Sequence, residues 1–119
     1  MKLDVKFYYV RWLPRFAGIC IAPKLILIRK DQAGNERLHR HELIHAEQQM
    51  TEGLLRFWWR YLFPSHRLRY EVDAYRRSSG QDWYVASYRA AIANLLVNSY
   101  YVGKSYREVL ELLTATVEA

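Results

Sequence analysis

The chain has little cysteine and no long apolar run. Its 119 residues include one cysteine, Cys20, which excludes an internal disulfide, so nothing in the sequence requires an oxidising compartment. Cys20 lies in an apolar segment, where we expect it to pack as a small hydrophobic side chain rather than act as a reactive thiol. Internal repeats, low-complexity tracts and a long linker are also lacking. We therefore expect one domain spanning residues 1–119.

No apolar segment is long enough to be expected to cross a membrane. The run 19–28 has ten residues and is interrupted by a proline and a lysine. Residues 1–10 alternate charged and aromatic side chains and lack the continuous apolar region of a signal peptide. Residues 54–63 are aromatic-rich but contain two arginines; this segment could lie on a membrane surface, although a core or partner-facing helix is the favoured interpretation. We expect a cytoplasmic protein, or one associated with a virion.

Positive charge is in excess. The formal net charge is +6, and arginines cluster at positions 56, 60, 67, 69, 76 and 77. A basic surface of this kind can attract nucleic acid, anionic lipid or an acidic protein, and it can equally be a solvated helix face. No recognised nucleic-acid-binding motif accompanies the charge. The apolar content of 51% argues against disorder and for a packed core.

Short β segments come first in the chain. Residues 18–21 and 25–28 are apolar and β-branched, and the turn-forming residues 22–24 separate them. This pattern predicts a short hairpin or one kinked strand, followed by a polar turn over 29–35.

Helices are expected over the rest of the chain. Asn35 is a candidate N-cap for a helix over 36–52, and Gly53 is its expected C-terminal stop. Ser65 is a candidate cap after Pro64, and Ser105 opens a capping-box pattern. The further helices are predicted at 54–63, from 65 to about 77, at 83–99, and from 105 towards 116.

The first of these helices contains an HExxH pattern, His41-Glu42-Leu43-Ile44-His45. Residues i and i+4 of a helix share a face, so the two imidazoles can bind one metal ion. Glu42 lies beside that position and can serve as general base for a bound water. The arrangement favours zinc-assisted hydrolysis of an amide bond.

Two faces of this helix are expected to differ in character. The spacing i, i+3, i+7 predicts a buried stripe of Leu43, Ala46 and Met50. A second stripe, rotated away from the first, holds His41, His45 and Gln48 or Gln49.

A catalytic zinc site usually has a third protein ligand. The residues after the motif offer neither the glycine nor the histidine of an HExxHxxGxxH site. The best candidate is Glu71, 26 positions after His45, on a later helix; the alternative role of Glu71 is an ion pair with Arg67. Asp73 lies roughly 200° around the helix from Glu71 and is not expected to share the metal.

Side chains near Glu71 fit a ligand helix that approaches the metal closely. Ala74, three residues on, keeps the face small, and Tyr75, four residues on, can donate its hydroxyl to an oxyanion. His66 is a second oxyanion candidate, although a first-turn helix residue is its more ordinary role. His39 lies on another face and is expected to be solvated.

The sequence resembles the short gluzincin-type metallopeptidase-like proteins of bacteria and phages, sometimes called minigluzincins. The resemblance covers roughly residues 17–75 and includes the strand end 26–31, the motif segment 40–49, the aromatic stretch 57–61 and the Tyr70-Glu71-Val72-Asp73-Ala74-Tyr75 element, which is similar to ExEAY.

This resemblance implies a ligand set and a fold. Its zinc ligands correspond to His41, His45 and Glu71, and its general base corresponds to Glu42. It also implies an α+β, mainly α, fold: a zincin-like helical core made of the HExxH helix and the third-ligand helix, with a small N-terminal β element.

We therefore expect a zinc-dependent metallopeptidase that acts on a peptide or protein substrate. An edge strand within 18–28 can align an extended substrate by main-chain pairing. One alternative is a non-enzymatic, zinc-stabilised structural or interaction protein of a phage or bacterium. A basic nucleic-acid-binding protein, resting on the charge alone, is the other.

Overall fold

The computed structural model of the chain describes residues 5–13 and 16–118. The described part is mainly helical with one small sheet, which confirms the α+β, mainly α, class. The chain divides into two compact units, residues 1–58 and 59–119. The expected single domain stays a prediction.

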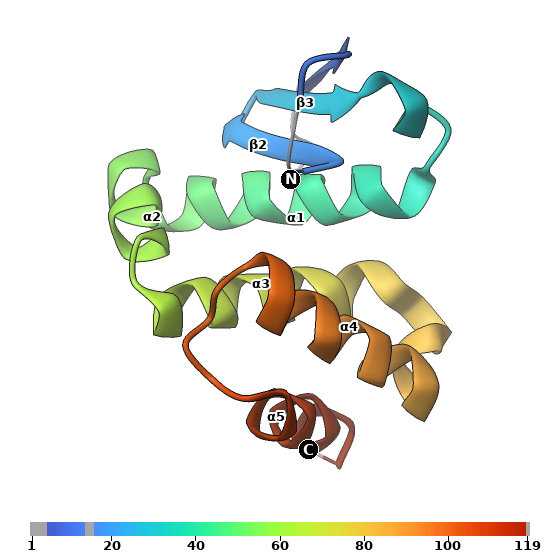
Figure 1. The fold of residues 1–119 in the computed structure, drawn as a ribbon. Helices are drawn as coiled ribbons and strands as arrows, with labels where there is room; N and C mark the ends of the chain where they lie inside the picture. Colours follow the sequence, from blue (N-terminus) through green and yellow to red (C-terminus); the bar gives the residue numbers. More distant parts are fainter. Residues whose placement is uncertain (1–4, 14–15, 119) are drawn as a thin grey trace. The chain divides into compact units, whose positions relative to one another are not determined.

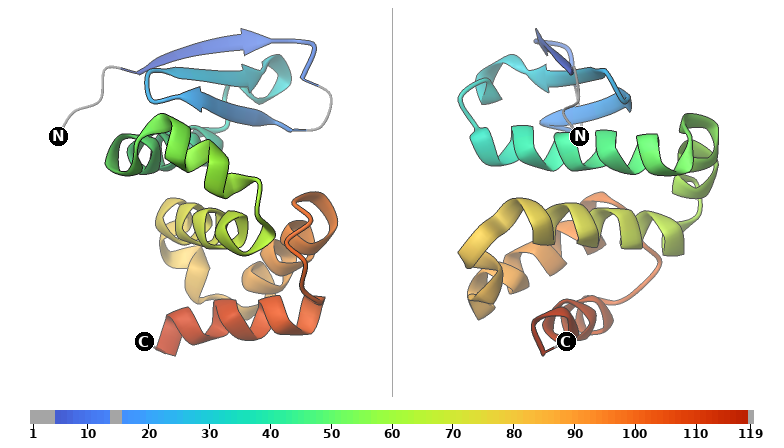
Figure 2. Two further views of the ribbon diagram at one scale, coloured as in Figure 1. Left: turned by 90° about the vertical axis from the view of Figure 1, so that its left-hand side faces the viewer. Right: turned by 180° about the vertical axis from the view of Figure 1, so that it is seen from behind.

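The first unit contains a three-stranded sheet (Figure 2). The hairpin prediction is confirmed, because β2 (Gly18–Ala22) runs antiparallel to β3 (Leu25–Arg29). A further strand, β1 (Lys6–Val10), pairs in parallel with β3 and was not predicted. The strand order β1-β3-β2 leaves β3 in the centre and β2 at one edge. A short 3₁₀ turn, η1 (Lys30–Gln32), lies within the expected polar turn.

Helix α1 (Glu36–Glu52) packs against β2, and Figure 1 shows it running along the sheet. Both predicted ends are confirmed: the Asn35 side chain accepts a hydrogen bond from the Leu38 N–H (3.1 Å), and Gly53 has a φ of 90°. The small core between helix and sheet consists of Cys20, Ile26, Ile28 and Ala46, with Val5, Phe7, Leu38 and Leu43 at its margin.

The predicted apolar stripe of α1 is partly wrong. Ala46 is fully buried and Leu43 half-buried, but Met50 is 40% exposed. Leu43 and Ala46 pack on the core beneath the sheet, and the polar residues Glu42 and Gln49 also contact β2. The surface of α1 that meets the sheet is therefore partly polar, which hydrophobic periodicity alone does not predict.

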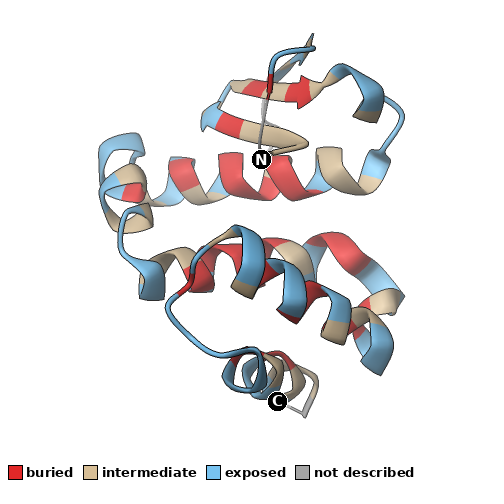
Figure 3. Cartoon of the chain, in the orientation of Figure 1, coloured by how far each residue is buried: buried red, intermediate tan, exposed pale blue. Residues whose placement is uncertain are grey.

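The second unit consists of helices. Their bounds are α3 (Pro64–Ser79), η2 (Gly80–Tyr84), α4 (Ala86–Ser99) and α5 (Tyr106–Glu118), while α2 (Leu54–Tyr61) spans the division between the units. The core consists of apolar side chains from α3 onwards: Leu68, Val72, Trp83, Ile92, Ala93, Leu96, Val102, Val109 and Leu113. Figure 3 shows the buried residues of α1 and α3 in red; they include His41, Glu42 and His45 on α1 and Glu71 on α3.

Two predicted helix starts in this unit are wrong and one is confirmed. Pro64 is itself the first residue of α3, so Ser65 is inside the helix and is not its cap; proline suits this position because the first N–H has no helical partner. Trp83 lies in the 3₁₀ segment η2, and α4 begins at Ala86. The capping box is present, since the Glu108 N–H donates to Ser105 Oγ (3.2 Å) and the Ser105 N–H to Glu108 Oε1 (3.1 Å).

Across residues 5–13 and 16–118, the helices are too short or too polar for any of them to cross a lipid bilayer.

Candidate metal centre

In the first unit, α1 brings the two motif histidines together. His41 and His45 are both buried, and their Nε2 atoms lie 3.2 Å apart. The ring centroids are 4.7 Å apart and the ring planes are nearly perpendicular. Two nitrogens bound to one tetrahedral zinc ion at the usual bond length would be roughly 3.3 Å apart. The spacing therefore matches the requirement for two ligands of one ion.

The second histidine has a partner for its other ring nitrogen. Nδ1 of His45 lies 2.8 Å from Gln48 Oε1, an acceptor that favours the proton on Nδ1 and the lone pair on Nε2. The ring of Phe57 lies edge-on to it at 6.1 Å. Of the two glutamines left open by the sequence, Gln48 is the one that shares this face.

Glu42 lies next to the histidines, on the side of α1 that faces β2. It is 5% exposed, so its carboxyl group is largely removed from water. A Cβ atom added at Gly18 would lie 3.4 Å from Glu42 Cγ, and only 3.0 Å from Ile28 Cδ1. The absence of a side chain at Gly18 therefore lets the strand pass close to the candidate base.

Gln49 of α1 and Cys20 of β2 connect the helix to the strand. The Gln49 Nε2 donates to the Cys20 carbonyl (2.8 Å), and the thiol donates to the Ala22 carbonyl (3.3 Å) with Gln49 Oε1 3.5 Å away. Burial, and then the negative charge of Glu42, raise the pKa of the Cys20 thiol to about 12. Its predicted role as a buried, small hydrophobic residue in a strand is confirmed.

In the second unit, Glu71 is buried in α3 and is 2% exposed. Its Oε2 accepts a hydrogen bond from the Tyr61 hydroxyl (2.6 Å), a short contact of the kind that charged acceptors make. One carboxylate oxygen is thus held by a neutral donor, and monodentate ligation of a metal requires only the other. This environment is compatible with a ligand.

The alternative role of Glu71, an ion pair with Arg67, is not the arrangement observed. The guanidinium of Arg67 instead donates to backbone carbonyls, those of Tyr61 (2.9 Å), Leu62 (3.1 Å), Tyr100 (2.8 Å) and Tyr101 (3.1 Å). It also lies over the Tyr61 ring, 5.5 Å from the centroid. Arg67 therefore fixes the segment that carries the tyrosine bound to Glu71.

The hydroxyl of Tyr75 lies 3.0 Å from that of Tyr100. Burial raises the pKa of Tyr100 well above its usual value, and the negative charge of nearby Glu71 adds to that effect. Tyr61, Tyr75 and Tyr100 thus form a cluster of phenols around Glu71. The oxyanion role of Tyr75 stays a prediction.

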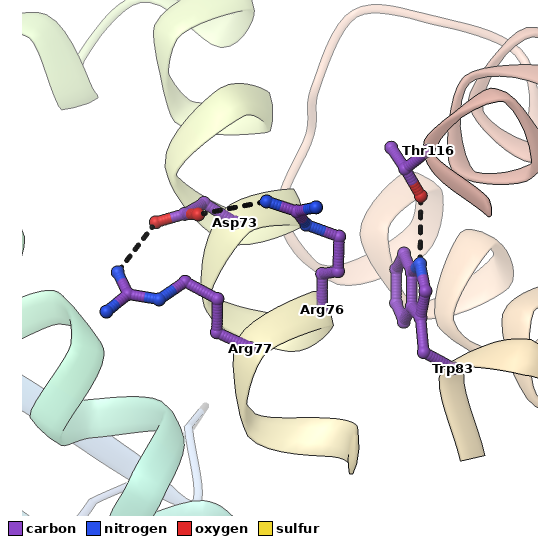
Figure 4. A network of polar contacts seen from close by, with 5 residues as sticks. All are labelled: Asp73, Arg76, Arg77, Trp83 and Thr116. Carbon is purple, nitrogen blue, oxygen red and sulfur yellow. Dashed lines mark hydrogen bonds and ion pairs between the residues drawn. The ribbon is translucent and has the colours of Figure 1, made fainter. Parts of the chain in front are cut away.

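Asp73 is directed away from this cluster, as expected from its position on the helix. Figure 4 shows its carboxylate between two arginines of the same helix, 3.3 Å from Arg77 and 4.0 Å from Arg76. The same view shows Trp83 donating to Thr116 Oγ1 (2.8 Å), a contact that ties η2 to α5.

The two remaining histidines lie outside the motif. His66 is half-buried in the first turn of α3, as expected. His39 is half-buried rather than solvated: Nδ1 lies 2.7 Å from the Asn35 carbonyl, Nε2 lies 3.1 Å from the Tyr9 hydroxyl, and the ring packs on Phe7. The correction follows from β1, which supplies both aromatic residues and was not predicted.

The sequence interpretation missed three residues of these surroundings, namely Gly18, Tyr61 and Tyr100. In the sequence, Tyr61 is part of an aromatic stretch, and Tyr100 is in a Tyr100-Tyr101 pair after a predicted helix. Gly18 is the first residue of a predicted strand. A glycine at the edge of an apolar strand is a signal of close backbone approach, and was available in the sequence.

The pKa of Cys20 predicts a protected thiol. Because the pKa is about 12, against 9.0 for an ordinary cysteine, the native protein at neutral pH should be alkylated roughly a thousandfold more slowly than the unfolded chain. The rate should rise as the pH approaches the folded-state pKa. The measurement is iodoacetamide labelling followed by mass spectrometry, with guanidinium-unfolded protein as the control. Equal rates for the native and unfolded chains would contradict the burial of this thiol.

Comparison with known proteins adds no family to this geometry. No family model, no curated protein and no solved structure matches the chain. The resemblance to minigluzincins therefore stays a prediction, and the function is inferred from the residues themselves.

Proposed function

We propose that the chain is a zinc-dependent metallopeptidase in which His41, His45 and Glu71 hold the metal ion and Glu42 is the general base. The single observation that carries this proposal is the 3.2 Å separation of the two imidazole Nε2 atoms, with Gln48 Oε1 at the other ring nitrogen of His45. Both features meet the requirements of two histidines that bind one metal ion.

The chemistry of the three candidate ligands favours zinc. His41, His45 and Glu71 are all buried, and each offers one ligand atom. Two imidazoles and one carboxylate are a ligand set of catalytic zinc sites, which keep one position open for water. When bound, zinc supplies a Lewis acid that brings the pKa of a water near ~7 and polarises a carbonyl group.

Glu42 supplies the proton transfers. From its place beside the histidines, its carboxylate takes a proton from the attacking water and returns it to the amine that leaves. A closed structural zinc site has no use for a base. The place of Glu42 in the motif, next to both histidines, therefore supports an enzyme over a zinc-stabilised structural module.

Edge strand β2 supplies a means of holding substrate. It is hydrogen-bonded to β3 on one side, and Gly18 lies beside Glu42. An extended peptide pairing with this edge would run past the general base. The substrate class we propose is accordingly an extended segment of peptide or protein.

The ligand set is tested by metal content. Glu71→Ala should lower zinc affinity by roughly a hundredfold or more, because removal of a group that merely supports a ligand already costs about 10–100-fold. The control is Asp73→Ala on the same helix, which removes an arginine partner and should leave zinc affinity unchanged. Zinc titration against a competing chelator gives both values. Wild-type protein without stoichiometric zinc would refute the proposal.

The general base is tested separately from the metal. Glu42→Gln should retain zinc and lower peptide hydrolysis by about 10²–10⁴-fold, since only the proton acceptor is lost. Glu47→Gln, an exposed acid on the same helix, is the matched control. Digestion of a peptide library with mass-spectrometric readout measures the rates. A zinc-loaded wild type that cleaves no peptide would point to the structural alternative.

Tyr61 is expected to act as a positioning residue for Glu71. Tyr61→Phe removes the hydroxyl that holds Oε2 and should weaken zinc binding by about 10–100-fold, with little change in fold stability. Tyr84→Phe, which alters an exposed tyrosine of the same unit, should have no effect. Unchanged zinc affinity in Tyr61→Phe, alongside a large loss in Glu71→Ala, would reject the role of Tyr61 alone.

A further inference from the structure

A group of positively charged side chains lies at one end of the sheet in the first unit. Strands β1 and β3 are parallel and end at the same edge, with Val10 opposite Arg29 in the ladder (Figure 2). Arg11 follows the last residue of β1, and Lys30 follows the last residue of β3. The parallel pairing therefore brings three cationic side chains together from two segments that are distant in sequence.

These side chains border a cavity at the surface of the unit. Its volume is about 400 Å³, and the residues that line it are Arg11, Arg29, Lys30 and Asp31. Sites for small molecules have volumes of roughly 300–1,000 Å³, so the cavity is large enough for a small organic ligand. Arg11 and Lys30 are exposed, and a ligand can reach them from solvent.

Acidic side chains do not balance the charge around this cavity. Arg29 Nε donates to Asp31 Oδ1 (2.7 Å), so one cation and the one carboxylate that lines the cavity are paired. Within residues 5–13 and 16–118, no carboxylate forms an ion pair with Arg11 or Lys30. Like charges that are held close together repel each other, and a bound anion removes that repulsion.

We propose that this cavity binds a dianionic phosphate group, either inorganic phosphate or the terminal phosphate of a small monoester. Such a group carries a charge of about −1.5 to −2 at neutral pH, which matches the two cations that Asp31 does not neutralise. A carboxylate or a phosphodiester would supply only one negative charge.

The types of side chain also favour phosphate. Guanidinium groups donate paired hydrogen bonds to phosphate oxygens, and a lysine adds a compact positive charge. The ion pair with Asp31 orients Arg29 before a ligand arrives, which lowers the entropic cost of binding. None of these side chains belongs to the candidate metal centre, so the inference does not depend on the proposed hydrolysis.

Calorimetric titration of the full chain tests the charge of the ligand. Glycerol phosphate and inorganic phosphate, both dianions, should bind saturably, and dimethyl phosphate, a monoanion, should bind roughly fivefold or more weakly. The two dianions distinguish the two sources of the group. Tighter binding of glycerol phosphate would assign the cavity to a monoester, and equal or tighter binding of inorganic phosphate would assign it to the free ion.

Variants test the position of the site. Arg11→Gln should weaken the binding of either dianion by about tenfold, because it removes a charged donor. Asp31→Asn keeps an oxygen that can accept the Arg29 hydrogen bond but removes the negative charge, so it should tighten binding. Lys24→Gln is the matched control, because Lys24 is exposed and precedes β3 at the opposite end of that strand.

The control variant should bind like the wild type, and circular dichroism should show all variants folded. Three results would overturn the proposal: no saturable binding of either dianion by the wild type, dimethyl phosphate bound as tightly as glycerol phosphate, or an equal loss of affinity in Lys24→Gln and Arg11→Gln.

Discussion

The hydrogen bond from Gln49 to the Cys20 carbonyl sets the rotation of α1 against the sheet. Gln49 is 1% exposed, so the bond is made away from water, where an unsatisfied partner would be costly. Because side chains repeat every 3.6 residues, fixing Gln49 on β2 also fixes Glu42 beside Gly18. The histidines at 41 and 45 are then placed on the neighbouring face. One buried polar contact thus orients both the candidate base and two candidate ligands.

The surroundings of Glu71 are organised by a different kind of contact. Arg67 donates hydrogen bonds to backbone carbonyls from two separate segments of the chain. Tyr61 and Tyr100 are brought to Glu71 by those segments. Arg67 thus positions the backbone around Glu71, and the Glu71 carboxylate accepts a hydrogen bond from the Tyr61 hydroxyl.

Local signals in the sequence predicted local structure well. Three local features depend on residues within one helical turn, and all three are present: the N-cap at Asn35, the helix end at Gly53 and the capping box at Ser105. The HExxH spacing likewise sufficed to bring the imidazoles together, because i and i+4 are neighbours on any helix.

Features that depend on distant residues could not be predicted in the same way. The parallel pairing of β1 with β3 joins segments separated by a hairpin, and it also buries part of His39. The contacts of Glu42 and Gln49 with β2 were not predicted, because Leu43, Ala46 and Met50 form a regular apolar pattern on the same helix. Tyr61 and Tyr100 lie at the ends of α2 and α4, and their contacts depend on how the chain turns after each helix, which no periodicity encodes.

The histidine pair depends on residues close in sequence, whereas the surroundings of Glu71 depend on distant ones. This difference affects the order in which the chain folds. The histidine pair exists as soon as a few turns of α1 form, which for an isolated helix takes about a microsecond or less. The Arg67 contacts to Tyr100 and Tyr101 span more than thirty residues and require α4 to have folded back, so loop closure must come first. In a nascent chain, the two histidine nitrogens are therefore close together before the Arg67 contacts that position the backbone around Glu71 have formed.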